Sequence, residues 1–216
     1  MSKLTVDISI SLDGFVAGPN QTLDQPLGEG GEGLHEWVYT LASWRRSHGR
    51  SGGETNADSE IVDETLRSTG ATVMGRRMFS GGAGAWDDDP NANGWWGDEP
   101  PFRHPVFVLT HHAREPITMQ GGTTFTFVTE GIEAALEQAR AAASEKNVAV
   151  AGGGEAVQQY LKAGLLDELQ LHVVPLLLGD GVRLFSGHLE AGQVELERMR
   201  VVDSPAVTHL KYRVVR

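Results

Sequence analysis

A run of three glycines joins an apolar segment to an amphipathic one in the second half of the chain. Val148–Ala151 predict a short buried strand, and Gly152–Gly154 follow it directly. Glu155 then opens a segment whose apolar residues recur at helical spacing through Leu161. Glycines at a helix N-terminus leave backbone N–H groups open to an approaching anion. The run predicts either a phosphate cradle or a tight turn that needs glycine dihedral angles, and it fits neither G-x-G-x-x-G nor the P-loop pattern.

A second strand-to-glycine junction carries two arginines. Ala71–Met74 predict a short strand that runs into Gly75, Arg76 and Arg77. Arginine supplies a forked, permanently charged donor that suits phosphate oxygens. The pair is therefore a candidate phosphate site, and the solvated start of a helix is the alternative.

Two further groups of polar residues follow predicted strands. Asp13 lies after the alternating segment Leu4–Ile10, where it is a candidate for contact with substrate or a turn residue before glycine. His111 and His112 follow the predicted strand Val106–Thr110. Adjacent histidines point in different directions and lack the i, i+4 spacing of helical metal sites, so we predict no metal centre.

Charge and cysteine content narrow the classes of function. The chain has 18 basic and 29 acidic residues and a net charge of −11, which argues against nucleic acid or an anionic membrane as partner. It has no cysteine, so disulfides, thiolate metal sites and cysteine nucleophiles are excluded. The N-terminus lacks the apolar core of a signal peptide, and Val173–Leu178 is too short to span a bilayer. We expect a soluble, cytoplasmic protein with a small-molecule substrate.

Alternating strands and helices must position these residues. The patterns predict helices over 34–48, 58–68, 132–143 and 155–163, and strands over 4–10, 71–74, 106–110, 124–128, 148–151, 169–174, 182–185, 194–202 and 207–215. This order favours an α/β fold with a mostly parallel central sheet and antiparallel C-terminal edge strands. We expect one domain over 1–216, with loop insertions near 26–56 and 82–100. The tryptophans of the second insertion either stack on a flat ligand or pin the loop to the core.

Several motifs together resemble the dihydrofolate-reductase-like superfamily, in the branch that contains the reductase domain of bacterial riboflavin biosynthesis (deaminase-reductase). They are SLDGFVAG (11–18), VMGRRMF (73–79), VFVLT (106–110), VAGGGEAV (150–157), GLLDELQLHVVPLLLGDGVRLF (164–185) and the closing strand pair. The resemblance implies a three-layer fold with NADPH across the carboxyl ends of the parallel strands. The adenosine phosphate side would be held by Gly75, Arg76, Arg77, Thr110 and His111. The diphosphate would be held by Gly152, Gly153, Gly154 and Glu155, and Val16 and Ala17 would border the nicotinamide.

The resemblance predicts an NADPH-dependent reductase that transfers a hydride to a small cyclic C=N or carbonyl-type substrate. One alternative is the 5-amino-6-(5-phosphoribosylamino)uracil reductase of riboflavin biosynthesis, and another is a non-catalytic nucleotide-binding protein. Riboflavin-pathway reductases usually have a glutamate before the paired glycines, where this chain has Ala151. Asp13 is the catalytic candidate, and Glu36 or Glu60 is a candidate for the carboxylate that folate reductases carry after the first loop.

The segment Leu169–Leu178 predicts assembly. It is apolar on both faces, more than a terminal strand needs to bury in its own core. Related reductase domains pair through strands in this region, so the resemblance implies a homodimer.

Overall fold

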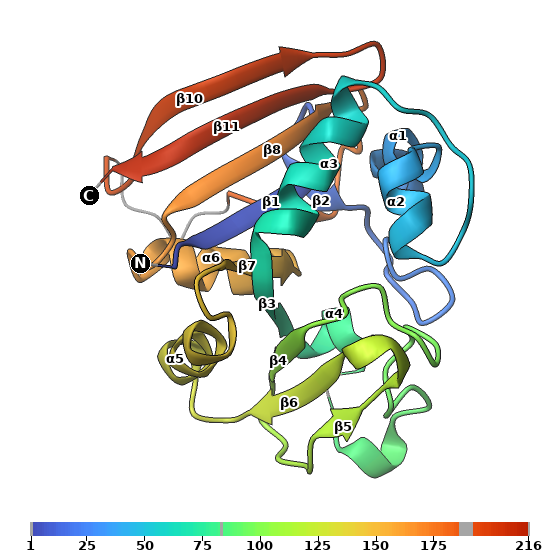
Figure 1. Cartoon of the computed structure of the whole chain (residues 1–216), viewed down its shortest axis with the longest axis vertical. Coiled ribbons are helices and arrows are strands. Elements are labelled where there is room, and N and C mark those ends of the chain that lie inside the picture. Colours follow the sequence, from blue (N-terminus) through green and yellow to red (C-terminus); the bar gives the residue numbers. More distant parts are fainter. Residues whose placement is uncertain (1, 83, 186–191, 216) are drawn as a thin grey trace.

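A nine-stranded sheet organises the chain (Figure 1). The computed structural model describes residues 2–82, 84–185 and 192–215. The strand order is β10-β11-β8-β1-β7-β3-β4-β6-β5. The strands of this sheet are β1 (Leu4–Ser11), β3 (Thr69–Gly75), β4 (Pro105–Leu109), β5 (Ile117–Thr118), β6 (Thr124–Val128), β7 (Asn147–Gly152), β8 (Glu168–Val174), β10 (Glu195–Asp203) and β11 (Thr208–Val215).

The six central strands run parallel, β11 and β5 run antiparallel to them, and the edge strand β10 again has the direction of the central strands. Strands β8, β1, β7, β3, β4 and β6 pair in parallel register. Strand β11 pairs antiparallel with β8 and β10, and β5 pairs antiparallel with β6. Strands β2 (Phe15–Ala17) and β9 (Val182–Arg183) form a separate antiparallel ribbon. The predicted α/β class, with its antiparallel C-terminal pair, is confirmed.

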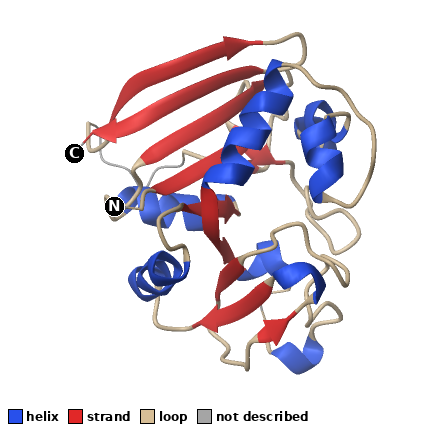
Figure 2. Ribbon diagram, in the orientation of Figure 1, coloured by secondary structure: helices blue, strands red, loops and turns tan. Residues whose placement is uncertain are grey.

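Helices cover both faces of the sheet (Figure 2). Helices α5 (Ile132–Ala142) and α6 (Gly154–Lys162) pack on the face to which β1 turns Leu4, Val6 and Ile10. Alternation along a strand sends Asp7, Ser9 and Ser11 to the opposite face, where α3 (Ala57–Ser68) lies and Thr65 bonds to Asp7. The shorter helices are α1 (Glu36–Tyr39), α2 (Ala42–Ser47), α4 (Arg76–Ser80), and the 3₁₀ turns η1 (Gly31–Leu34), η2 (Trp86–Asp88) and η3 (Gln120–Gly122).

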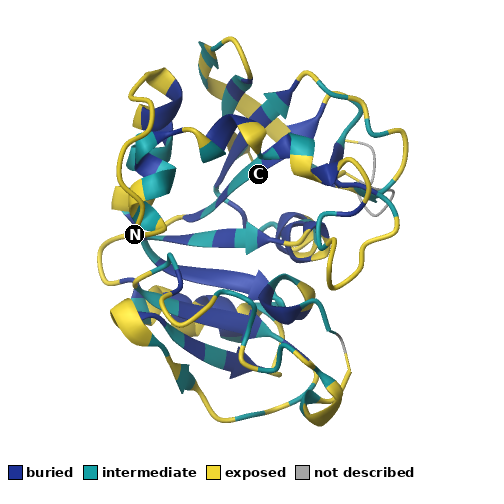
Figure 3. Cartoon of the chain, turned by 90° about the vertical axis from the view of Figure 1, so that its right-hand side faces the viewer, coloured by how far each residue is buried: buried dark blue, intermediate teal, exposed yellow. Residues whose placement is uncertain are grey.

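The second insertion is held against an aromatic core on the β3–β4–β6 part of the sheet. Phe79, Phe125 and Phe127 are buried there, and Trp86 and Trp96 of the insertion pack against this cluster. Figure 3 shows how buried residues concentrate in the strands while the connecting loops are exposed. Trp86 and Trp96 therefore pin the loop to the core, which is the second of the two roles considered from the sequence.

The continuous helix predicted over 34–48 is wrong. The structure divides this segment into η1, α1 and α2, and Leu41 between α1 and α2 has extended backbone. Leu41 forms a parallel bridge with Glu54, and the flanking Thr40 and Ala42 exchange backbone hydrogen bonds with the same residue. These long-range bonds take the backbone groups that would have continued the helix. Leu34, Trp37 and Leu41 nevertheless bury their side chains in a small cluster of their own.

Two local predictions also need correction. Helix α3 is capped by Asn56, whose side chain accepts a hydrogen bond from the Ser59 nitrogen at 3.0 Å, whereas Asp58 lies inside the first turn and is buried. The strand predicted over 182–185 ends at Arg183, and Phe185 is exposed. Strand β8 is a central strand between β1 and β11, so its apolar residues are buried in this chain's own sheet. The observation behind the predicted homodimer therefore has an intramolecular explanation.

Candidate functional site

The two glycine junctions predicted from the sequence lie side by side at the carboxyl edge of the parallel strands. A Cβ added to Gly75, at the end of β3, would lie 3.8 Å from the nitrogen of Gly153 and 3.9 Å from the carbonyl oxygen of Gly152. Gly152 has φ +126° at the end of β7, and its peptide bond to Gly153 is cis. A Cβ on Gly153 would meet none of the described atoms within 4 Å. The approach to this turn is therefore open to a ligand.

The third glycine has a packing role. A Cβ on Gly154 would lie 3.0 Å from Val182 Cγ1 and 3.3 Å from Val16 Cγ2, so its absence lets the start of α6 sit against the β2–β9 ribbon. Val16 and Ala17 are both buried in β2. Val16 thus lies beside the glycine turn, while Glu155 in the first turn of α6 is exposed.

The two arginines after β3 differ sharply in environment. Arg76 is 7% exposed, and its guanidinium donates to Ser80 and forms an ion pair with Asp89. Arg77 is 71% exposed, and its Nη1 lies 3.9 Å from Glu155 Oε1 across the glycine turn. The structure therefore brings Arg77 to the open site and commits the side chain of Arg76 to the interior.

The residues after β4 lie next to this junction. Register places Gly75 opposite Leu109, so Thr110 and His111 leave the sheet at the same level as the two arginines. Thr110 is buried, and its hydroxyl accepts a hydrogen bond from the His112 nitrogen at 3.1 Å. His111 is exposed, which leaves its imidazole accessible from the solvent side.

The carboxylate of Asp13 is held by one side chain and two backbone amides. It accepts hydrogen bonds from Ser11 Oγ at 2.6 Å, Gly179 N at 2.7 Å and Leu178 N at 3.2 Å. The Ser11 bond first, and then the Gly179 and Leu178 amides, lower the pKa of Asp13 to about 2, although desolvation opposes them. Asp13 therefore stays ionised and ties the first loop to the segment after β8. It is unsuited to donate a proton at neutral pH.

The polar face of the sheet holds a buried chain of titratable groups that we did not predict from the sequence. Asp7 Oδ1 lies 2.6 Å from His172 Nε2, His172 Nδ1 lies 2.6 Å from His209 Nδ1, and His209 Nε2 lies 2.9 Å from Asp58 Oδ1. The four residues come from β1, β8, β11 and α3. The indole of Trp37 packs on both imidazoles, at 4.7 and 5.2 Å between ring centroids. A signal in the sequence was the polar His172 within β8, a strand that is otherwise mostly apolar and almost wholly buried.

The spacing of these groups fixes their protons. Two ring nitrogens at 2.6 Å need one proton between them, since two lone pairs would repel. Burial raises the pKa of Asp7, but the charge and the hydrogen bond of His172 outweigh this effect and lower the pKa. Burial lowers the pKa of His209, against the opposing hydrogen bond to Asp58. The groups thus act as one unit with interlocked protons, which links α3 to the middle of the sheet.

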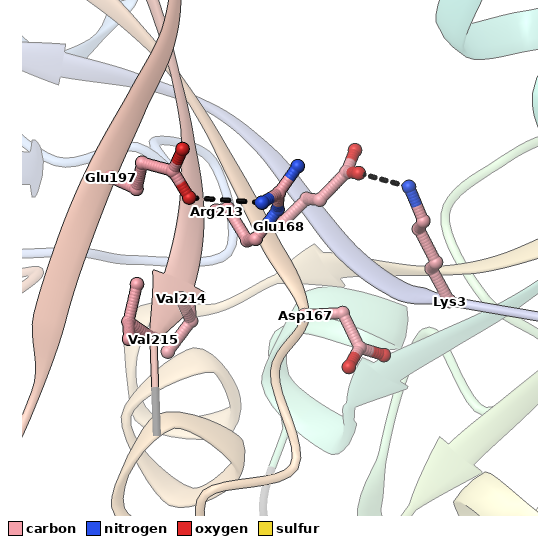
Figure 4. Close-up of a pocket in the computed structure, with 7 residues that line it drawn as sticks. All are labelled: Lys3, Asp167, Glu168, Glu197, Arg213, Val214 and Val215. Atoms are coloured by element: carbon pink, nitrogen blue, oxygen red, sulfur yellow. Dashed lines mark hydrogen bonds and ion pairs between the residues drawn. The ribbon is translucent and has the colours of Figure 1, made fainter.

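Two surface cavities lie away from the glycine turns. The larger, of 440 Å³, is at the amino end of β1 and β8 and is shown in Figure 4. Its charged residues are paired with one another or with neighbours: Glu168 with Lys3 and Lys211, and Arg213 with Glu197. The smaller, of 340 Å³, lies between α3 and β10. Neither touches the carboxyl edge where the predicted site residues meet.

Several other sequence predictions have a clear position. Glu36 and Glu60 are both exposed, whereas the buried carboxylate of α3 is Asp58. Ala151 lies near the end of β7 and packs partly buried against the aromatic core. Among the residues that the structure describes there is no cluster of three metal-ligating side chains, and no helix is long and apolar enough to cross a membrane.

Comparison with known proteins gives matches along nearly the whole chain. A family model described as the RibD C-terminal domain matches residues 2–209. The chain is 35% identical over 186 residues to the uncharacterized protein YwjB of Bacillus subtilis (strain 168), which covers 85% of this chain and 82% of that protein.

Solved structures with the same fold include a putative riboflavin biosynthesis protein from Shewanella sp. PV-4, with a TM-score of 0.63 and 23% identity over 100% of both chains. A diaminohydroxyphosphoribosylaminopyrimidine deaminase/5-amino-6-(5-phosphoribosylamino)uracil reductase from Thermotoga maritima has a TM-score of 0.55 and 14% identity, over 98% of this chain and 56% of that one. At these identities the two likenesses establish the fold.

Proposed function

The chain belongs to the RibD C-terminal domain family, a family of reductase domains, and on this premise we propose that it is an NADPH-dependent reductase. It would transfer a hydride to a small cyclic C=N or carbonyl-type substrate. The observation that supports the proposal is that Gly75 lies close to Gly152 and Gly153 at the carboxyl edge of the parallel strands, where no described atom blocks the approach to Gly153. In open α/β sheets, ligands bind at this edge.

The residues around the turn fit a dinucleotide phosphate. The start of α6, which has nine residues, has no side-chain cap on its backbone N–H groups, and the missing Cβ of Gly153 permits a ligand to approach them closely. Arg77 offers an exposed guanidinium for the 2′-phosphate, and His111 lies on the neighbouring strand end. Val16 would border the nicotinamide ring, which supplies the hydride when NADPH is bound.

Asp13 would serve this reaction by holding the first loop in place. Its three hydrogen bonds join Ser11 to the Leu178–Gly179 turn, so that the loop and the segment after β8 would together border the proposed site. Because its pKa is lowered to about 2, the proton that accompanies hydride transfer must come from another group or from water.

Two alternatives can be separated by experiment. The first is the 5-amino-6-(5-phosphoribosylamino)uracil reductase activity, which the name of the Thermotoga relative suggests and which Ala151 argues against. The second is a nucleotide-binding protein without turnover. NADPH oxidation should be followed with that pyrimidine and with a panel of cyclic imines and carbonyl compounds, alongside direct NADPH binding. Turnover near one per second with the pyrimidine would favour the first alternative. Tight binding without turnover of any compound would favour the second.

We also expect a homodimer. Leu196, Met199 and Val201 are more than one third exposed on the edge strand β10, and they offer an apolar surface to a second copy. Sedimentation at micromolar concentration should show a species of twice the chain mass of 23.3 kDa, and a species of 23.3 kDa alone would contradict the expectation.

A further inference from the structure

The second insertion reaches the phosphate side of the proposed site. The indole of Trp86 lies 4.8 Å from the ring of Phe127, and its Nε1 donates to the carbonyl oxygen of His112 at 2.7 Å. The guanidinium of Arg76 lies over the same indole, at 3.6 Å from the ring centroid. The insertion is therefore docked directly on the first arginine after β3.

The carboxylate of Asp89 is the ion-pair partner of Arg76. Its side chain is 2% exposed, and it pairs with the guanidinium of Arg76. Ser80 Oγ donates to Asp89 Oδ2 at 2.7 Å, and the Asn91 nitrogen donates to Asp89 Oδ1 at 2.9 Å. A Cβ on Gly82 would lie only 2.6 Å from Asp89 Oδ2, so the carboxylate sits in a slot that only glycine leaves free.

A second cation adjoins this pair. The guanidinium of Arg114 lies 4.7 Å from the centroid of Trp86 and 5.1 Å from that of Phe127. Burial, and then the charge of Arg76, lower the pKa of Arg114, although Asp89 raises it. Asp89 thus pairs with the guanidinium of Arg76, while that of Arg114 bonds to the Ala92 carbonyl oxygen and Asn93 and lies within the electrostatic reach of the same carboxylate. Without that carboxylate, the positive charge around Trp86 would be uncompensated and would attract an anion from outside.

We propose that Asp89 is a specificity-determining residue, an internal anion that holds Arg76 away from the 2′-phosphate of the dinucleotide. Recognition of that phosphate then rests on Arg77, which faces the open turn 3.9 Å from Glu155. This inference rests on the proposed function, because it concerns the cofactor of the same site. The insertion that carries Asp89 would therefore reduce the preference of the protein for NADPH over NADH.

The test measures binding alone. Dissociation constants for NADPH and NADH are determined by calorimetry with the wild-type protein, Asp89→Asn and the control Asp88→Asn, which makes the same change of charge at an exposed neighbouring position. Asparagine keeps an oxygen for the Asn91 amide and releases Arg76 from its counter-ion. We expect Asp89→Asn to raise the ratio of the NADH to the NADPH dissociation constant about tenfold. Asp88→Asn should leave this ratio within about twofold of wild type.

A double variant covers the case in which Asp89→Asn does not fold. Arg76→Met with Asp89→Leu removes both charges together, so that no buried charge remains unpaired. We expect this variant to keep the wild-type ratio, and a fall of about fivefold or more would overturn the proposal by showing that Arg76 already contacts the phosphate. An unchanged ratio in folded Asp89→Asn would also overturn it while leaving the proposed cofactor site intact. Failure of every variant and of the wild type to bind either dinucleotide would overturn both.

Discussion

Replacing Asp58 with alanine should destabilise this fold well beyond the usual effect of removing a helix carboxylate. Asp58 and His209 are 5% and 1% exposed, and the bond between Asp58 Oδ1 and His209 Nε2 is 2.9 Å long. The substitution leaves the Nε2–H of His209 without an acceptor in the interior. A buried unpaired donor costs roughly 1–3 kcal/mol, and an uncompensated buried charge about 3–5 kcal/mol. Because His209 is also tied to His172 through the proton between their Nδ1 atoms, the lost bond disturbs the whole chain of groups, and we expect a loss of about 3 kcal/mol of unfolding free energy.

A matched control lies on the same helix. Asp63 also forms an ion pair, with Arg46, but its side chain is 30% exposed and that of Arg46 is 65% exposed. Such a surface pair contributes at most about 1 kcal/mol. Both substitutions gain the same helix propensity, and the first-turn position of Asp58 adds no more than about 1 kcal/mol through the helix dipole. The difference between the two variants therefore isolates the buried chain.

Thermal unfolding and urea unfolding at pH 7.5, both followed by far-UV circular dichroism, measure the stability of both variants. For a domain of this size, about 3 kcal/mol corresponds to a fall in Tm of roughly 6–12 °C. The control Asp63→Ala should change Tm by less than about 4 °C. If Asp58→Ala unfolds at the same urea concentration as Asp63→Ala, the chain from Asp7 to Asp58 does not stabilise the fold and its proton arrangement has been misread.

Three further predictions concern the cofactor site and pH. Gly153→Val should weaken NADPH binding at least about tenfold with an unchanged far-UV spectrum, because the new side chain clashes with no protein atom but fills the space that the diphosphate would occupy. Gly84→Val adds a side chain at an equally open position in the insertion and should leave NADPH affinity unchanged. Arg77→Ala should lower NADPH affinity about three- to tenfold and leave NADH affinity unchanged, as calorimetry will show. Burial, and then the charge of Lys146, lower the pKa of His104 to about 4, so the native state binds fewer protons than the unfolded chain below pH 6.5. Its contribution to stability should be complete above pH 6.5 and decline towards pH 4, and urea midpoints across this range should fall less steeply in His104→Gln.

Local patterns were sufficient for most of the strands and helices and for the place of the two glycine junctions in the sheet. Apolar runs with β-branched residues predicted β7 and β4 closely, and the sequence interval from Thr124 to Val128 matches β6 in full. Glycines after β3 and β7 indicated where backbone would stay open, since the carboxyl ends of parallel strands share one edge of the sheet. Local sequence patterns can predict these features because they depend on residues that are close together in the chain.

Local patterns failed where a distant partner competes for a backbone or side-chain group. The helix predicted over 34–48 is broken because Glu54 pairs with Leu41. The residues around Asp58 predict that it caps a helix, yet its side chain is buried in a hydrogen bond with His209, which is 151 positions away in the chain. Periodicity records that a residue is apolar or polar but not which strand will lie beside it.

The sequence by itself determined the α/β class, the two glycine junctions and the presence of two arginines beside one of them. Only the tertiary structure decided that Arg76 is buried against Asp89 while Arg77 faces the turn. Adjacent residues at the start of a helix point in different directions, and which one is buried depends on what packs there. The insertion with Trp86 and Asp89 packs over Arg76, because the indole of Trp86 packs against the aromatic core that contains Phe79 and Phe127.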